Sequence, residues 1–155
     1  MGVAEYSFEI TPRIETPVAT QAREDISFMA GYDIGEVSAR RVYKINGEFS
    51  PDDLNRIAGE LLCDPVTETC CREEPGERGL SLTVAYRPGV LDGEAMVLLE
   101  ALKIMNIYGA VSAASLRKYV FKPSAPQHII EKYAPLTLFN EIIESGMFSE
   151  YEPVS

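Results

Sequence analysis

The sequence predicts an α+β protein built from two tandem copies of one small unit. Three observations support this prediction. Residues recur at a constant separation of 76 positions, each half opens with an alternating strand pattern followed by an amphipathic helix, and a charged segment with Pro and Gly lies between the halves. We expect the first copy at residues 5–72, a linker at 73–79 and the second copy at 80–150.

Identical residues recur in the same order along both halves, and one separation of 76 positions serves them without a gap. The pairs are Pro12 and Pro88, Ala19 and Ala95, Met29 and Met105, Tyr32 and Tyr108, Arg41 and Arg117, Tyr43 and Tyr119, Ala58 and Ala134, Leu62 and Leu138, and Glu68 and Glu144. A fixed spacing of this kind marks a repeated structural unit, so both halves are expected to fold alike.

Each copy is expected to open with a strand and a helix. Apolar and polar residues alternate over 6–10 and over 81–86, and a proline follows each segment. Helices are predicted at about 18–30 and at about 94–106. Their apolar faces are expected to consist of Val18, Ala22, Ile26 and Met29 in the first copy, and of Leu98, Leu99, Leu102 and Met105 in the second.

The second part of each copy is predicted to contain a strand, at 37–45 and at about 111–121, and a further helix. In the first copy Ser50 is a suitable N-cap, Pro51 takes the first helical position, and apolar residues follow helical spacing to Leu62. A last strand is predicted at 66–71. In the second copy the helix begins after Pro126 and is interrupted at Pro135. A helical pattern resumes over 138–144, and no further strand is predicted.

The element order strand–helix–strand–helix is that of a ferredoxin-like unit, with helices on one face of an antiparallel or mixed sheet. A unit of about seventy residues has a marginal core, so the two copies are expected to share an interface as an intramolecular pseudo-dimer. Met96, Val97 and Ile104 make the helix at 94–106 apolar nearly all round. We therefore expect that helix to be buried, between the copies rather than against another subunit.

Composition excludes several classes of function. A net charge of −10 disfavours nucleic-acid binding and favours a partner with basic patches. The sequence has no apolar run of membrane-spanning length and no secretory signal pattern, so a cytoplasmic location without membrane binding is expected. The three cysteines are odd in number and two of them are adjacent, which does not suggest disulfides. With His128 as the single histidine, we expect no metal site and no cofactor.

Motifs for catalysis are missing from the sequence. It contains no glycine-rich phosphate loop and no nucleophile elbow, so we expect no catalytic residues. A basic-aromatic strand in each copy stands out instead. It supplies the candidate partner-binding residues Arg40, Arg41, Tyr43, Lys44, Arg117, Lys118 and Tyr119. The functional interpretation is a surface that docks a partner or an anion, and the alternative is charge that protects an exposed edge strand.

Four segments resemble the PurS-type domain of phosphoribosylformylglycinamidine (FGAM) synthase. Residues 42–54 (VYKINGEFSPDDL) and 60–68 (ELLCDPVTE) resemble its second half, where a helix ends in Leu-Leu-x-(Asp/Asn)-Pro-Val before a strand. Residues 84–92 (VAYRPGVLD) resemble the strand and turn that open the domain, and residues 117–119 are similar to its basic-aromatic strand. Together the matches span most of residues 5–150. The tandem arrangement is similar to the N-terminal region of longer single-chain forms of the enzyme.

The resemblance implies a non-catalytic subunit of an ATP- and glutamine-dependent C–N ligase in purine biosynthesis. Such a subunit bridges the synthetase (PurL-type) and glutaminase (PurQ-type) components and assists ammonia transfer between them. Further homodimerisation stays open. The alternative function is a small-molecule-binding regulatory protein, because tandem ferredoxin-like units commonly bind ligands between their copies.

Overall fold

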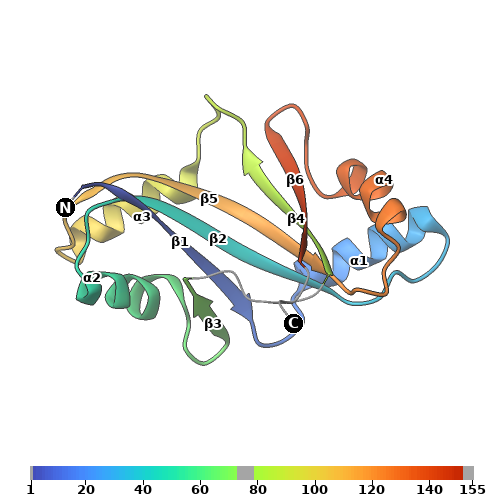
Figure 1. Cartoon of the computed structure of the whole chain (residues 1–155), viewed down its shortest axis with the longest axis horizontal. Helices are drawn as coiled ribbons and strands as arrows, with labels where there is room; N and C mark the ends of the chain where they lie inside the picture. The colour runs from blue at the N-terminus through green and yellow to red at the C-terminus, as the bar shows by residue number, and fades with distance from the viewer. Residues whose placement is uncertain (1, 73–78, 152–155) are drawn as a thin grey trace.

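The computed structural model describes residues 2–72 and 79–151. The elements are β1 (Ala4–Pro12), α1 (Pro17–Ala30), β2 (Val37–Gly47), α2 (Pro51–Arg56) with the π-helical segment η1 (Ile57–Leu62), β3 (Glu68–Cys71), β4 (Gly79–Tyr86), α3 (Gly93–Ile104), β5 (Ala110–Phe121), α4 (Gln127–Thr137) and β6 (Glu144–Tyr151). These strands form one sheet in the order β3-β1-β2-β5-β4-β6, and every pairing is antiparallel (Figure 1). The predicted α+β class is confirmed.

The long central pairing between β2 and β5 joins the two halves of the chain. It runs from Val37 opposite Phe121, through Arg41 opposite Arg117, to Asn46 opposite Ser112. Each half thus supplies three adjacent strands to the sheet. Of the predicted linker at 73–79, only Gly79, which begins β4, lies within the described residues.

The helices cover one face of this sheet. Phe8 lies opposite Tyr43, and residues paired across an antiparallel ladder point to the same side. The register across β2, β5 and β4 places the buried strand residues of both cores on this same side. Buried residues of every helix in the described part belong to these cores, so the helices lie on this side too. None of these helices has the length and apolar composition needed to cross a membrane.

Two hydrophobic cores lie on the helix face, and each contains residues from both halves. In the α1–α4 core, Ala22 and Ile26 of the first half pack with Leu82, Val84 and Ile130 of the second. In the α2–α3 core, Leu98 and Leu102 of the second half pack with first-half residues, which include Phe8, Ile10 and Leu54. Figure 1 shows α1 beside α4 at one end of the sheet and α3 near α2 at the other.

Side chains cap the starts of three helices, and the cap predicted at Ser50 is confirmed. The hydroxyl of Ser50 accepts the N–H of Asp53 at 3.1 Å, and the Asp53 carboxylate accepts the N–H of Ser50 at 3.3 Å, which makes a capping box before α2. Thr16 caps α1 and Asp92 caps α3 with a single bond each: the side chain accepts the backbone N–H of the residue three positions onward. Gly31 ends α1 with φ of 83°, a conformation that glycine adopts without a Cβ penalty.

The end of the chain differs from the prediction. The helical pattern expected over 138–144 is wrong, because residues 138–143 form no helix and Glu144–Tyr151 forms β6 against β4. The prediction that only the first half has a third strand is therefore also wrong. Pro135 does not interrupt α4, which continues to Thr137. Pro135 lies near the C-terminal end of α4, where its missing N–H removes one helical bond, and the N–H of Leu138 still donates to the carbonyl of Ala134.

Two finer predictions also need correction. In α1 the buried residues are Ala19, Ala22 and Ile26, whereas the predicted face residues Val18 and Met29 are exposed. The gap-free repeat fails in the first strands: Ile10 lies opposite Arg41 and Val84 lies opposite Arg117, which is a separation of 74 rather than 76. The turn that follows is two residues longer in the second half, which restores the separation of 76 between the caps Thr16 and Asp92.

Candidate functional site

A cavity of about 330 Å³ lies on the helix face at the centre of the sheet, between the two cores. We call it the central cavity. Its walls come from β2, β5, the ends of β1 and β4, the starts of β3 and β6, and the first turns of α1 and α3. Among its lining residues are Thr16, Val18, Ala39, Arg41, Glu68, Val84, Tyr86, Glu94, Ser115, Arg117, Tyr119 and Glu144.

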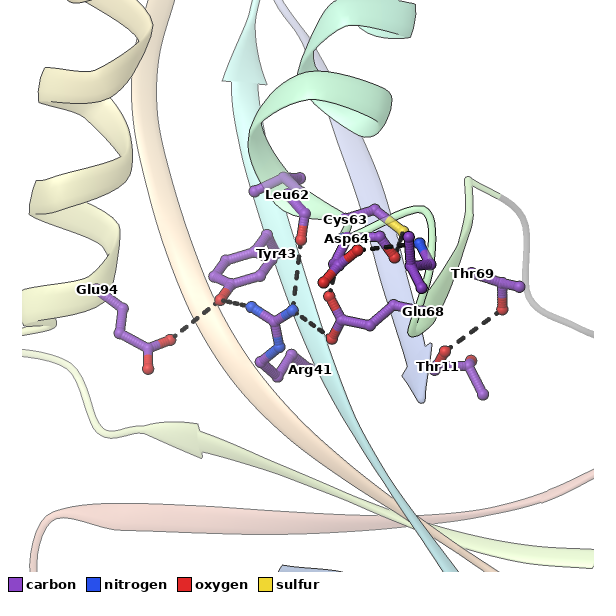
Figure 2. A network of polar contacts seen from close by, with 10 residues as sticks. Thr11, Arg41, Tyr43, Leu62, Cys63, Asp64, Glu68, Thr69 and Glu94 are labelled. Atoms are coloured by element: carbon purple, nitrogen blue, oxygen red, sulfur yellow. Dashed lines mark hydrogen bonds and ion pairs between the residues drawn. The ribbon is translucent and has the colours of Figure 1, made fainter. Parts of the chain in front are cut away.

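Arg41 is the centre of a polar network on the first-half side of this cavity (Figure 2). Its Nη1 donates to the hydroxyl of Tyr43 at 3.0 Å. Its Nη2 donates to the carboxylate of Glu68 at 2.7 Å and to the carbonyl of Leu62 at 3.4 Å. One guanidinium thus connects the central strand β2 to the end of η1 and to the start of the edge strand β3.

Arg117 makes the corresponding contacts on the second-half side. Its Nε donates to the hydroxyl of Tyr119 at 3.4 Å, and its Nη1 donates to the carboxylate of Glu144. Its Nη2 donates to the carbonyl of Leu138 at 3.1 Å. Each of these partners lies 76 positions after the residue that Arg41 contacts, so the network repeats with the spacing found in the sequence.

The two glutamates of these networks lie deeper than the arginines. The side chains of Glu68 and Glu144 are 18% and 10% exposed, against 44% and 39% for Arg41 and Arg117. Backbone N–H groups of Asp64 and Asn140 donate to them at 3.0 and 3.1 Å. Burial raises the pKa of Glu144. The hydrogen bonds from Arg117 and from the Asn140 backbone together lower it by more than burial raises it, so the net shift of this pKa is downward.

Tyr43 extends the first network toward α3. Its hydroxyl accepts from Arg41 and donates to the carboxylate of Glu94 at 3.4 Å (Figure 2). Burial raises the pKa of Tyr43, which keeps the phenol protonated and able to donate. Glu94 itself is exposed at the start of α3, so it brings a negative charge to the rim of the cavity.

Asp92 is a structural residue that the sequence reasoning did not identify. Besides capping α3, its carboxylate accepts the N–H and the hydroxyl of Ser115, both at 2.7 Å. These bonds attach the start of α3 to β5, next to the last β4 pairing at Leu116. The available signal was an Asp before the predicted helix, which is a common N-cap.

Three of the predicted partner-binding residues lie on the other face of the sheet. Arg40 and Lys118 lie opposite each other and are 4% and 5% exposed in their side chains. The carboxylate of Glu9 bridges them, at 3.0 Å from Nη1 of Arg40 and 2.6 Å from Nζ of Lys118. Lys44 is more exposed and lies 4.0 Å from the carboxylate of Glu5.

The seven predicted residues therefore do not form one surface. Arg41, Arg117 and Tyr119 line the central cavity, and Tyr43 belongs to its network. Arg40 and Lys118 also border the cavity, but strand alternation places their side chains on the other face. The alternative interpretation, in which these charges protect exposed edge strands, is wrong, because β2 and β5 are the two central strands of the sheet. Their charges cannot protect an edge.

Helix α3 is buried on one side only. Ala95, Leu98 and Leu102 face inward, and the two leucines belong to the α2–α3 core with first-half residues. The expectation that the remaining apolar residues are covered by the other copy is wrong: Met96, Val97 and Ile104 are 53%, 70% and 82% exposed. We call these three residues the outer face of α3.

The cysteines and histidine do not form a reactive centre. No disulfide joins Cys63, Cys70 and Cys71, and burial raises the pKa of Cys70 to about 11. The thiolate, which is the nucleophilic and metal-binding form, is therefore disfavoured there. His128 is exposed at the start of α4. Within residues 2–72 and 79–151 no group of three or more His, Cys, Asp or Glu side chains is placed to hold a metal ion.

No protein-family model matches this chain, and no curated protein matches it.

Proposed function

We propose that the chain is a non-catalytic structural subunit of FGAM synthase in the cytoplasm, which bridges the PurL-type synthetase and the PurQ-type glutaminase and assists ammonia transfer. In this proposal residues 5–72 and 80–150 are two copies of one ferredoxin-like, PurS-like unit, packed as an intramolecular pseudo-dimer. Arg41 opposite Arg117 carries the proposal. These residues are 76 positions apart, so a two-fold axis through the pair would exchange one copy with the other.

The rest of the β2–β5 register supports such an axis. Tyr43 lies opposite Ser115, and Ala39 lies opposite Tyr119. Adding 76 to either member on β2 gives the β5 residue of the other pair, so the two pairs exchange under the same rotation. The strand order β3-β1-β2-β5-β4-β6 also reads alike from both ends when β1, β2 and β3 correspond to β4, β5 and β6.

The hydrogen bonds of the central arginines support a scaffold rather than an enzyme. The arginines at the centre are hydrogen-bonded to glutamates, tyrosines and backbone carbonyls, which is an arrangement that fixes loops in place. Burial raises the pKa of Cys70, which disfavours its thiolate, and the single histidine is on the surface. The outer face of α3 supplies exposed apolar area of the kind that marks protein contacts.

Reconstitution with the two proposed partners tests this function. The PurL-type and PurQ-type chains would be assayed for FGAM formation with glutamine and, separately, with ammonia, in the presence and absence of this protein. A bridging subunit is needed only when ammonia must pass between active sites, so omission should abolish the glutamine-dependent reaction and spare the ammonia-dependent one. Full glutamine-dependent activity without this chain would overturn the proposal.

A pair of matched variants locates the contact. Val97→Asp introduces a charge on the outer face of α3, whereas Val66→Asp makes the same change at an exposed position before β3. We expect Val97→Asp to weaken copurification with the partners by at least about tenfold, and Val66→Asp to leave it unchanged. Equal effects of both variants would exclude α3 as the contact.

A further inference from the structure

The central cavity exposes hydrogen-bond donors that the protein does not use. A guanidinium carries five N–H groups. Arg41 makes three hydrogen bonds and Arg117 makes three, all to residues of the described segments 2–72 and 79–151. Two N–H groups on each side chain therefore have no partner in that part of the chain. With exposures of 44% and 39%, both side chains have surface available to a ligand.

The acceptors in the cavity are largely occupied. Glu68 and Glu144 lie behind the arginines and already accept from a guanidinium and from a backbone N–H each. The cavity surface thus offers unused donors next to carboxylates that are already bound. A ligand that complements this surface must bring acceptor oxygens.

The placement of the two arginines also favours an anionic ligand. Like charges directly opposite each other in an antiparallel pair destabilise a sheet, and Arg41 and Arg117 are such a pair. Glu68 and Glu144 each compensate one of these charges from behind, and a bound anion would add to this compensation on the cavity side. The first turns of α1 and α3, through Thr16, Val18 and Glu94, also border the cavity, and the positive ends of these helices favour negative charge.

We propose that the central cavity binds a small anion whose carboxylate or phosphate oxygens accept from the guanidinium groups of Arg41 and Arg117. A volume of about 330 Å³ is at the small end of the range found for ligand pockets, which fits a small metabolite rather than a nucleotide. The proposal adds a ligand site to the chain and does not depend on the scaffold function. Glu94 opposes the anion, because it is the exposed carboxylate at the rim and its hydrogen-bond partner, Tyr43, is neutral.

Titration with defined anions tests the site. The full chain would be titrated with inorganic phosphate and, separately, with malonate as a small dicarboxylate, with sodium chloride holding the ionic strength constant. Binding would be followed through the Nε–H resonances of arginine and through the shift in thermal unfolding temperature. We expect a saturable change at millimolar concentration with at least one of the two anions, and the preferred anion identifies the headgroup.

Three variants localise the binding. Arg117→Gln removes charge-assisted donors and should weaken the preferred anion by about tenfold or more. Arg23→Gln is the matched control, because it removes one positive charge from a pair with Asp33 outside the cavity, and it should change the affinity less than about twofold. Glu94→Gln leaves both arginine–glutamate pairs intact, which guards against loss of folding, and should bind the anion severalfold more tightly.

Absence of a saturable change with both anions would overturn the proposal. It would also be overturned if Arg23→Gln weakened binding as much as Arg117→Gln, or if Glu94→Gln failed to strengthen it. These results are independent of FGAM formation, so failure of this site and failure of the scaffold function are distinguished.

Discussion

Arg41 and Arg117 lie directly opposite each other at the centre of the sheet, and each donates to the glutamate that begins an edge strand. Both also donate to the backbone carbonyl at the end of a helical segment, Leu62 in one case and Leu138 in the other. The two arginines therefore fix the peripheral parts of the sheet to its centre. Removing either glutamate should loosen an edge strand.

Stability should depend on pH through Glu144. Burial opposes its ionisation, but Arg117 and the Asn140 backbone bring its pKa below the ordinary value in the folded protein. A carboxylate with a lowered folded pKa stabilises the fold above its unfolded pKa of about 4.3, and this contribution is lost as the pH falls through the folded pKa. Glu144→Gln should cost about 1.5–3 kcal/mol at pH 7 and should show a smaller further loss in acid than wild type.

Urea unfolding between neutral pH and the acid limit of folding measures this effect. Asp33, whose hydrogen bond from Arg23 lowers its pKa to about 2, remains in both proteins and contributes to their shared acid dependence. Parallel curves for wild type and Glu144→Gln would contradict the assigned role of Glu144.

Glu9→Gln should be one of the most destabilising single substitutions. The change removes the carboxylate that bridges Arg40 and Lys118, whose side chains are almost fully buried. Removing one member of a buried ion pair costs about 3–5 kcal/mol. Chemical denaturation provides the measurement. Glu5→Gln is the control. Glu5 lies in β1 like Glu9, but it is exposed and pairs with Lys44, so the change should cost less than about 0.5 kcal/mol.

Neither half should form a stable folded monomer by itself. Each core contains residues of both halves, so a chain ending at residue 72 would leave Ile26 of α1 without Leu82 and Ile130. We expect separately produced halves to unfold without cooperativity at low concentration and to gain structure when mixed, as monitored by circular dichroism and amide NMR spectra. A cooperatively folded, monomeric half would contradict this expectation.

Gly109→Ala should destabilise the α2–α3 end of the sheet. Gly109 has φ of 116°, and a Cβ atom there would lie 2.3 Å from the carbonyl oxygen of Glu48. The backbone would have to move, at a cost of about 2–4 kcal/mol. Gly59→Ala is the matched change, because a Cβ in η1 meets nothing within 4 Å and alanine favours a helix by up to about 1 kcal/mol. Thermal unfolding of the two variants should therefore shift in opposite directions.

Local signals in the sequence predicted most elements correctly. The strand at 37–45, the helix starts at Pro51 and Pro126, and the strand at 111–121 all depend on alternation, caps or proline, which are short-range features. The failures occurred where pairing partners decide the structure. Residues 144–151 become a strand because they lie along β4, and that neighbour is not visible in a local pattern.

The candidate site was predicted only in part. The basic-aromatic pattern identified Arg41, Tyr43, Arg117 and Tyr119, and the repeat identified Glu68 and Glu144, but nothing in the sequence joined the arginines to the glutamates. Alternation along a strand separates neighbouring residues onto opposite faces. Arg40 and Arg41 therefore have different surroundings, although the sequence analysis treated them as one surface.

The outer face of α3 has a consequence for stoichiometry. At the positions 76 residues earlier, α1 carries Thr20, Gln21 and Phe28 in place of Met96, Val97 and Ile104. A dimer of two identical chains would present the same helix twice and recruit two binding proteins. This single chain presents the apolar outer face on α3 and not on α1. A protein that binds this face would therefore bind at one end of the sheet, in one copy per chain.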